Sequence, residues 1–198
     1  KNWKFKKYNS ADITQFSENF SLTATVAKLL SIRKDKIDDI KLFLNPKIKN
    51  LLPNPFKIKD MQKAVDRTYK SIDNDDVIGV FGDYDVDGAT SSALLSSYFS
   101  SIKRKIVTYI PDRHKEGYGP TTKGFDNLIK FGSKIIFTVD CGTLSFKPIE
   151  FAKNLGVDVI VLDHHQSDVK LPEAFAIVNP NRYDDSSKLN YLCATGVC

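Results

Sequence analysis

The chain has 198 residues, of which 41% are hydrophobic and 27% charged, a composition that excludes a disordered or fibrous protein and is enough for one sizeable core. No apolar run approaches the roughly 20 residues that cross a bilayer, and the basic N-terminal stretch lacks the apolar segment and cleavage site of a secretory signal. The net charge of +5 suits a polyanionic partner, and three cysteines without metal-ligand spacing predict reduced thiols in a cytoplasmic protein.

The first part of the chain predicts a small helical segment without visible chemistry. Residues 1–20 are rich in aromatic side chains and are expected to form an irregular arm that packs on a neighbouring element. Apolar residues at helical spacing predict helices over residues 21–32 and 35–44. Three prolines predict a connecting loop over residues 45–59. We therefore expect an N-terminal helical domain over residues 1–59.

From residue 60 onward, apolar strand-like runs alternate with helical patterns. Asp60 is a plausible N-cap for the first of these helices. Near-continuous β-branched runs separated by helices are typical of a parallel sheet covered on both faces, so we predict an α/β fold over residues 60–198. The expected strands are 77–81, 105–110, 134–139, 157–162 and 176–178, and the expected helices are 60–72, 89–101, 121–131 and 146–155.

Acidic and imidazole side chains follow three of the predicted strands. Ligands of an open parallel sheet bind beyond the carboxyl ends of its strands, so these side chains are expected to converge at one edge. A single acidic residue after a strand is usually a helix cap, but convergence from three strands points to a metal site. The residues concerned are Asp83, Asp85 and Asp87 after the first strand, Asp140 after the third, and Asp163, His164 and His165 after the fourth.

The ligand types indicate which metal to expect. Carboxylates with imidazoles and no thiolate suit Mn²⁺ or Mg²⁺ better than structural zinc. Two ions that share a carboxylate would balance so many anionic ligands, and Asp140 is the natural bridge. Such a pair activates water and stabilises the charge that develops on a phosphoryl group. An EF-hand loop fails because its twelfth position is Leu94 instead of Glu.

The segment from Pro111 to Pro120 follows the second strand and is rich in glycine and charge. It can be read as a mobile loop or as a site of phosphate capture by Arg113, with His114 and Lys115 in support. Cys141, with histidines available at 164 and 165, could be read as a thiol nucleophile. Metal ligation suits those imidazoles better.

These motifs resemble those of the DHH phosphoesterase superfamily. The segments GDYDVDGAT, TVDCGT and VLDHHQ carry the resemblance to its first three motifs. Longer agreement, in FLNP at 43–46, DMQKAV at 60–65, PDRHKEGYGP at 111–120 and VNPN at 178–181, is similar to the RecJ branch of single-strand-specific exonucleases. The resemblance extends over nearly the whole chain.

The resemblance implies a phosphodiesterase that uses two Mn²⁺ or Mg²⁺ ions to release 5′-mononucleotides from single-stranded DNA in the 5′→3′ direction, in DNA repair and recombination. It implies single-stranded DNA, and replication or repair proteins, as partners, with no membrane. Asp163 is implied as a ligand or a supporting group, and Asp83 as a supporting group. His165 is implied to contact the scissile phosphate or to position the metals. The implied ligands are Asp85, Asp87, Asp140 and His164.

The resemblance also implies a fourth acidic motif and a second domain, which the 198 residues lack. We therefore expect a fragment of a longer protein, truncated within its DHH domain and inactive alone. Two other functions stay open on the sequence. One is a DHH hydrolase of short oligonucleotides, cyclic dinucleotides or pyrophosphate, and the other is a catalytically silent scaffold that binds nucleic acid.

Overall fold

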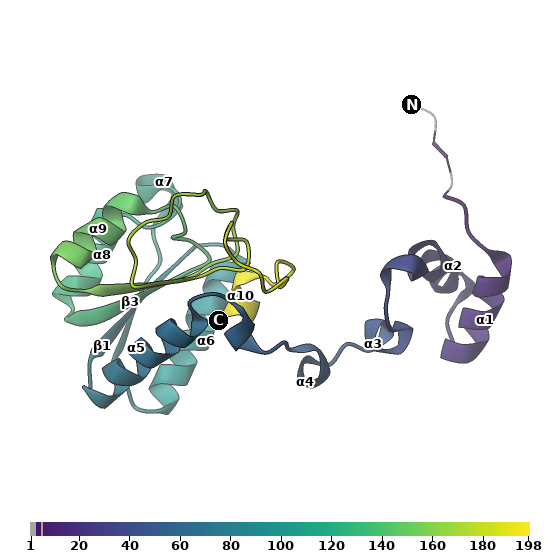
Figure 1. The fold of residues 1–198 in the computed structure, drawn as a ribbon, viewed down its shortest axis with the longest axis horizontal. Helices are drawn as coiled ribbons and strands as arrows, with labels where there is room; N and C mark the ends of the chain where they lie inside the picture. The colour runs from purple at the N-terminus through teal and green to yellow at the C-terminus, as the bar shows by residue number, and fades with distance from the viewer. Residues whose placement is uncertain (1–2, 5) are drawn as a thin grey trace. The chain divides into compact units, whose positions relative to one another are not determined.

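The computed structural model describes residues 3–4 and 6–198, and the chain forms two compact units, Lys1–Leu52 and Pro53–Cys198 (Figure 1). The division into domains at residues 59 and 60 stays a prediction. Within the described residues, no helix is both long and apolar enough to cross a membrane.

The first unit is a set of short helices. Phe16 of the first helix packs with Ala27 and Leu30 of the second to form its small core. The expected irregular arm is wrong from residue 10 onward, because the Asn9 side chain caps a helix that buries Phe16. The prediction of a loop over 45–59 is also wrong in part, since one short helix and one 3₁₀ turn lie there. The elements of this unit are α1 (Ser10–Phe20), α2 (Ala24–Arg33), the 3₁₀ helix η1 (Lys34–Lys36), α3 (Ile40–Leu44) and α4 (Ile48–Leu51).

A five-stranded sheet is the centre of the second unit. Every pair of neighbouring strands is parallel, and the strand order is β2-β1-β3-β4-β5. This confirms the predicted parallel α/β fold. The strands are β1 (Val77–Gly82), β2 (Ile106–Tyr109), β3 (Ser133–Val139), β4 (Asp158–Leu162) and β5 (Ala176–Val178).

Helices cover both faces of the sheet (Figure 1). Alternate residues of a strand point to opposite faces, and Ile78 and Val80 of β1 accordingly pack in one core while Phe81 packs in the other. Burying one such apolar side chain contributes about 1.5–3 kcal/mol. The first core includes side chains of α5 (Met61–Asp73), α6 (Val86–Ser101) and α10 (Ala194–Val197), and the second includes side chains of α8 (Thr122–Lys130) and α9 (Phe146–Asn154).

Two further elements connect these layers. The 3₁₀ helix η2 (Pro55–Lys57) precedes α5, and α7 (Arg113–Glu116) lies between β2 and α8. Asp60 does not cap α5 with its side chain as predicted. It has a positive φ, and its carboxylate instead accepts hydrogen bonds from the backbone of Ile177 at 3.2 Å and from Arg182 at 2.7 Å. Asp60 therefore ties the start of α5 to strand β5.

The strand order places a topological switch point between β1 and β3. The chain leaves β1 through α6 on one face to reach β2, then crosses the other face through α8 to reach β3 on the opposite side of β1. Connections that depart on opposite faces open a crevice at the carboxyl ends of the two strands, where ligands of such sheets bind. Asp83 and Asp140 directly follow these two strands.

Candidate metal centre

The sheet register places three aspartates side by side. Gly82 pairs with Val139, and Val139 pairs with Leu162, so the next residue of each strand is an aspartate. These are Asp83, Asp140 and Asp163, and each is no more than 3% exposed. The expected convergence at one edge of the sheet is therefore present, and it places three carboxylates in a mostly dry environment.

Asp140 is the least satisfied of these carboxylates. It is 1% exposed, its backbone has a φ of +60°, and neither of its side-chain oxygens has a hydrogen-bond partner within the described residues. Burial, followed by the neighbouring Asp85 carboxylate, raises the pKa of Asp140 to about 8. A buried carboxylate without partners is costly unless a proton or a cation neutralises it.

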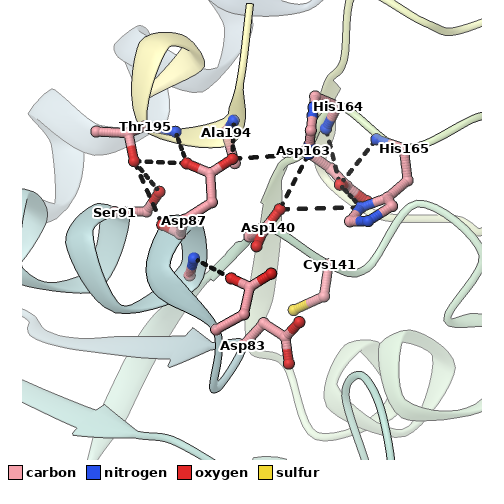
Figure 2. Close-up of polar contacts among 12 residues, drawn as sticks. Asp83, Asp87, Ser91, Asp140, Cys141, Asp163, His164, His165, Ala194 and Thr195 are labelled. Carbon is pink, nitrogen blue, oxygen red and sulfur yellow. Dashed lines mark hydrogen bonds and ion pairs between the residues drawn. The ribbon is translucent and has the colours of Figure 1, made fainter.

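Both histidines point toward Asp140 (Figure 2). The Nε2 atom of His164 lies 3.2 Å from Oδ1 of Asp140 and 3.6 Å from Oδ2 of Asp87. The Nδ1 atom of His165 lies 4.0 Å from the same Oδ1 atom of Asp140. Ligand atoms of Asp140, His164 and His165 come within 4.8 Å of one another, and so do those of Asp83, Asp85 and Asp140. Asp140 thus belongs to two groups, each able to hold one cation.

Asp163 orients the two histidines. Its Oδ1 accepts hydrogen bonds from the backbone of His164 at 2.7 Å and from Nδ1 of His165 at 2.8 Å. Its Oδ2 accepts from the backbone and the hydroxyl of Thr143, at 3.1 and 2.6 Å. Burial alone would raise the pKa of Asp163, but the hydrogen bonds from His165 and Thr143 outweigh it and lower the pKa to about 2. The same hydrogen bond, which His165 donates to Asp163, raises the pKa of His165.

Asp85 and Asp83 lie at the start of α6. Asp85 is exposed and caps the helix by accepting a hydrogen bond from Gly88 N at 2.9 Å, which lowers its pKa. Burial raises the pKa of Asp83. Gly88 is required here, since a Cβ at this position would come within 2.5 Å of the Asp83 carbonyl oxygen. This contact keeps the acidic loop tight against the first turn of the helix.

Asp87 is held by α10 rather than by the sheet. Its carboxylate accepts hydrogen bonds from Ala194 N at 2.7 Å, Thr195 N at 2.8 Å and Thr195 Oγ1 at 2.6 Å (Figure 2). Burial would raise the pKa of Asp87, but these hydrogen bonds outweigh it and keep the pKa below its ordinary value. One edge of the Asp87 carboxylate still faces His164.

The segment from Pro111 to Pro120 contributes Tyr118 and Arg113. The Tyr118 hydroxyl lies 3.3 Å from Nε2 of His165 and donates to the Asp140 carbonyl at 3.4 Å. The Arg113 guanidinium lies over the Tyr84 ring, 5.2 Å from its centroid. His114 is exposed, and its backbone N–H donates to Asp112 as part of the α7 cap. Part of the predicted loop is therefore the short helix α7.

The sequence interpretation missed three supporting residues. Asn179 is fully buried, and its amide donates to Thr143 Oγ1 at 2.8 Å and to the His165 carbonyl at 2.9 Å. Thr143 and Asn179 fall inside the TVDCGT and VNPN segments, so those segments offered a signal. Thr195 offered none, because it contacts Asp87 across 108 residues.

Cys141 faces the core below the site. It is 1% exposed, and burial raises its pKa well above the ordinary value, which favours the neutral thiol. A nucleophilic cysteine needs the thiolate. The arrangement of carboxylates and imidazoles with oxygen and nitrogen ligands is instead suited to a hard divalent cation.

Comparisons with known proteins indicate the family to which the chain is similar. A model of the DHH family, N-terminal domain, matches residues 77–198. The chain is 34% identical over 196 residues to the single-stranded-DNA-specific exonuclease RecJ of Bacillus subtilis (strain 168), covering 98% of this chain and 25% of that protein. It is 37% identical over 155 residues to the RecJ of Escherichia coli (strain K12), covering 78% of this chain and 27% of that protein. The chain spans about a quarter of the length of these relatives.

Solved structures support the same fold. A crystal structure of exonuclease RecJ bound to manganese is 28% identical, with a TM-score of 0.64 over 71% of this chain and 35% of that one. RecJ in complex with Mn²⁺ from Thermus thermophilus has a TM-score of 0.69 over 94% of this chain and 26% of that one, at 23% identity. At this identity, the similarity to the Thermus thermophilus structure shows the fold alone.

Proposed function

The chain belongs to the DHH family, and we propose that it is the metal-binding part of a RecJ-type exonuclease, which releases 5′-mononucleotides from single-stranded DNA in the 5′→3′ direction. The sequence identity to two enzymes named as single-stranded-DNA-specific exonucleases supports this function. The observation that carries it is Asp140, a buried carboxylate that accepts no hydrogen bond within the described residues and belongs to both groups of candidate ligands.

The residues of the centre fit two divalent cations, Mn²⁺ or Mg²⁺. The buried Asp140 carboxylate, which accepts no hydrogen bond within the described residues, is the group that most needs a cation, and Asp140 would be shared by both ions. Cations held here would polarise the phosphodiester and activate the attacking water. We propose His164, Asp85 and Asp87 as further ligands. Asp163 was predicted as a ligand or supporting group, and its full set of hydrogen bonds favours the supporting role.

The substrate phosphate would be bound by side chains near the carboxyl ends of β1 and β3. His165 directs Nδ1 at Asp163, so its Nε2 atom, which lies 3.3 Å from the Tyr118 hydroxyl, would be the one to contact the scissile phosphate. Its raised pKa favours the protonated ring, which suits contact with an anion. Arg113 would add a charge-assisted hydrogen bond to phosphate, with the exposed His114 in support. These roles place the scissile bond between the α7 segment and Asp140.

The test is cleavage of 5′-labelled single-stranded DNA by the full-length protein in Mn²⁺. We expect mononucleotide products, and a fall of several orders of magnitude in rate for Asp140→Asn, which preserves shape but removes the charge. Asp126→Asn is the matched control, because Asp126 lies on the surface of α8 and pairs only with Lys130 within the described residues. Equal rates for Asp140→Asn and the parent would refute the proposal.

The same assay distinguishes the proposed exonuclease from a hydrolase of small substrates. Rates that are much higher on a dinucleotide than on a long single strand would replace the exonuclease proposal with that function. Protein partners in replication or repair, and a cytoplasmic location, stay predictions.

A further inference from the structure

The two units of the chain differ in charge. Lys1–Leu52 holds eleven lysine and arginine residues against five aspartate and glutamate residues, a net charge of +6. Pro53–Cys198 holds eighteen against nineteen, a net charge of −1. The whole positive excess of the protein therefore lies in the unit that does not contain the candidate metal centre.

Part of this charge lines a groove in the first unit. The groove has a volume of about 520 Å³ and lies between the segment before α1, the end of α2 and the residues that follow it. Unlike Lys34, which pairs with Asp12 at 2.7 Å, its four cations form no ion pair with any acidic side chain in the described part of the chain. We call this surface the basic groove, and its cations are Lys4, Lys6, Arg33 and Lys36.

The basic groove also presents apolar side chains that the core of the unit does not use. Phe43 is 54% exposed and Leu29 is 49% exposed, whereas the core consists of Phe16, Ala27 and Leu30. An exposed aromatic ring among unpaired cations is the combination that binds single-stranded nucleic acid, because cations follow the backbone and the ring stacks on a base. A duplex offers phosphates but no free base faces.

We propose that the basic groove is a second binding site for single-stranded DNA, in which the four cations contact successive phosphates and Phe43 stacks on a base. The choice of single-stranded DNA as the polyanion rests on the proposed function. The complementarity of the basic groove to a polyanion does not depend on the proposed function. The net negative charge of the second unit does not attract DNA. The positive charge of the basic groove would attract it and so raise the concentration of substrate near the metal centre.

The test compares two triple variants of the full chain that each lose three positive charges. The groove variant carries Lys6→Gln, Arg33→Gln and Lys36→Gln. The control variant carries Lys41→Gln, Lys47→Gln and Lys49→Gln, which lie in the same unit but outside the groove lining. Binding of a fluorescent oligothymidylate is followed by anisotropy in EDTA over a series of salt concentrations, with circular dichroism to verify folding.

We expect the groove variant to bind at least tenfold more weakly and the slope of log K against log salt to fall by about 2, since each lost phosphate contact removes about 0.7. The control variant should lose less than threefold. Equal losses in both variants, or no loss in either, would overturn the proposal. The single tryptophan, Trp3, precedes Lys4, and its fluorescence should be quenched by the oligonucleotide in the parent and the control variant only.

A second variant tests the stacking contact. Phe43→Leu keeps an apolar side chain but removes the ring, and it should weaken single-strand binding about fivefold without changing the binding of a hairpin duplex. Equal losses on both ligands would refute stacking. Sedimentation with phosphatidylserine vesicles tests whether the basic groove binds an anionic membrane instead of DNA. Vesicle binding that the groove variant abolishes, with oligonucleotide binding unchanged, would overturn the proposal in favour of a lipid surface.

Failure of this inference can be separated from failure of the proposed function, because binding is measured without divalent metal. A parent that degrades DNA, with a groove variant that binds as tightly as the parent, refutes only the basic groove. A parent that binds through the basic groove but cleaves no DNA in Mn²⁺ refutes only the exonuclease.

Discussion

The Nε2 atom of His164 lies 3.2 Å from Oδ1 of Asp140, although the two residues follow different strands. Apart from the ion-pair contacts with the two histidines, the Asp140 carboxylate accepts no hydrogen bond within the described residues, and carboxylate oxygens of Asp85 and Asp140 lie within 4.8 Å of each other. A carboxylate in this position is neutral when it carries a proton, or neutralised when it holds a cation.

The first prediction concerns the pH dependence of stability in EDTA. The pKa of Asp140 is raised to about 8 in the folded protein, against 3.8 in the unfolded chain. Between these values the folded state holds a proton that the unfolded state releases, so the free energy of unfolding falls as pH rises from about 4 to about 8. Asp140→Asn removes this dependence. Urea denaturation should show the parent losing on the order of a few kcal/mol relative to the variant over that range.

The comparison of the parent with Asp140→Asn also controls for the other titrating groups of the site. Asp163 and His165 titrate in both proteins, so their contributions largely cancel in the difference between parent and variant. Parallel stability curves for the two proteins would show that Asp140 ionises normally. The account of its burial would then be wrong.

The second prediction concerns the contact between Thr195 and Asp87. Thr195→Val removes the hydroxyl donor to the Asp87 carboxylate but keeps the backbone N–H donors of α10. Groups that orient a ligand typically change metal affinity by about 10–100-fold when removed. We therefore expect Mn²⁺ affinity, measured by calorimetry, to fall about tenfold in Thr195→Val and to be restored in Thr195→Ser. Unchanged affinity in Thr195→Val would show that the Thr195 hydroxyl does not position Asp87 for metal binding.

The third prediction concerns the buried network below the histidines. Thr143 Oγ1 donates to the Asp163 carboxylate and accepts from the Asn179 amide. Thr143→Val removes both hydrogen bonds, so the buried Asp163 loses a donor and the buried Asn179 loses an acceptor. Unmade hydrogen bonds of this kind cost about 1–3 kcal/mol each. Thr143→Val should lower the free energy of unfolding by that order, whereas Thr143→Ser should lose much less. Equal destabilisation in both variants would contradict this account, because Thr143→Ser keeps the hydroxyl that Thr143→Val removes.

The fourth prediction concerns Arg113. Arg113→Gln removes a charge-assisted contact to substrate phosphate but no proposed metal ligand, so KM for single-stranded DNA should rise about tenfold while Mn²⁺ affinity stays constant. Arg113→Lys keeps the charge and should recover part of the loss. A change in Mn²⁺ affinity in Arg113→Gln would mean that the residue supports the metal centre instead.

Much of the fold follows from local sequence patterns. The β-branched runs predicted all five strands, and the position of Asp140 and Asp163 after two of them predicted the edge where the site forms. These predictions succeeded because a parallel sheet fixes which ends of its strands meet. The helix Ser10–Phe20 was missed because its stability depends on contact with α2 as well as on its own pattern.

The finer parts of the site depend on contacts between distant segments. Thr195 reaches Asp87 only after the chain has built all five strands, and no spacing near either residue indicates the contact. Tyr118 lies beside His165 because α7 and its loop return to the crevice. The concentration of positive charge in residues 1–52 could have been counted from the sequence, but the groove that gathers it needs the fold of the unit.

The central claim, that Asp140 is shared by two cations, is tested most directly by counting the Mn²⁺ ions bound to the full-length protein. Electron paramagnetic resonance of free Mn²⁺ during a titration gives both the number and the affinity of the bound ions. We predict two ions for the parent and for Asp126→Asn, and at least 100-fold weaker binding of both ions for Asp140→Asn. If Asp140→Asn binds two ions as tightly as the parent, Asp140 is not the shared ligand and the account is contradicted.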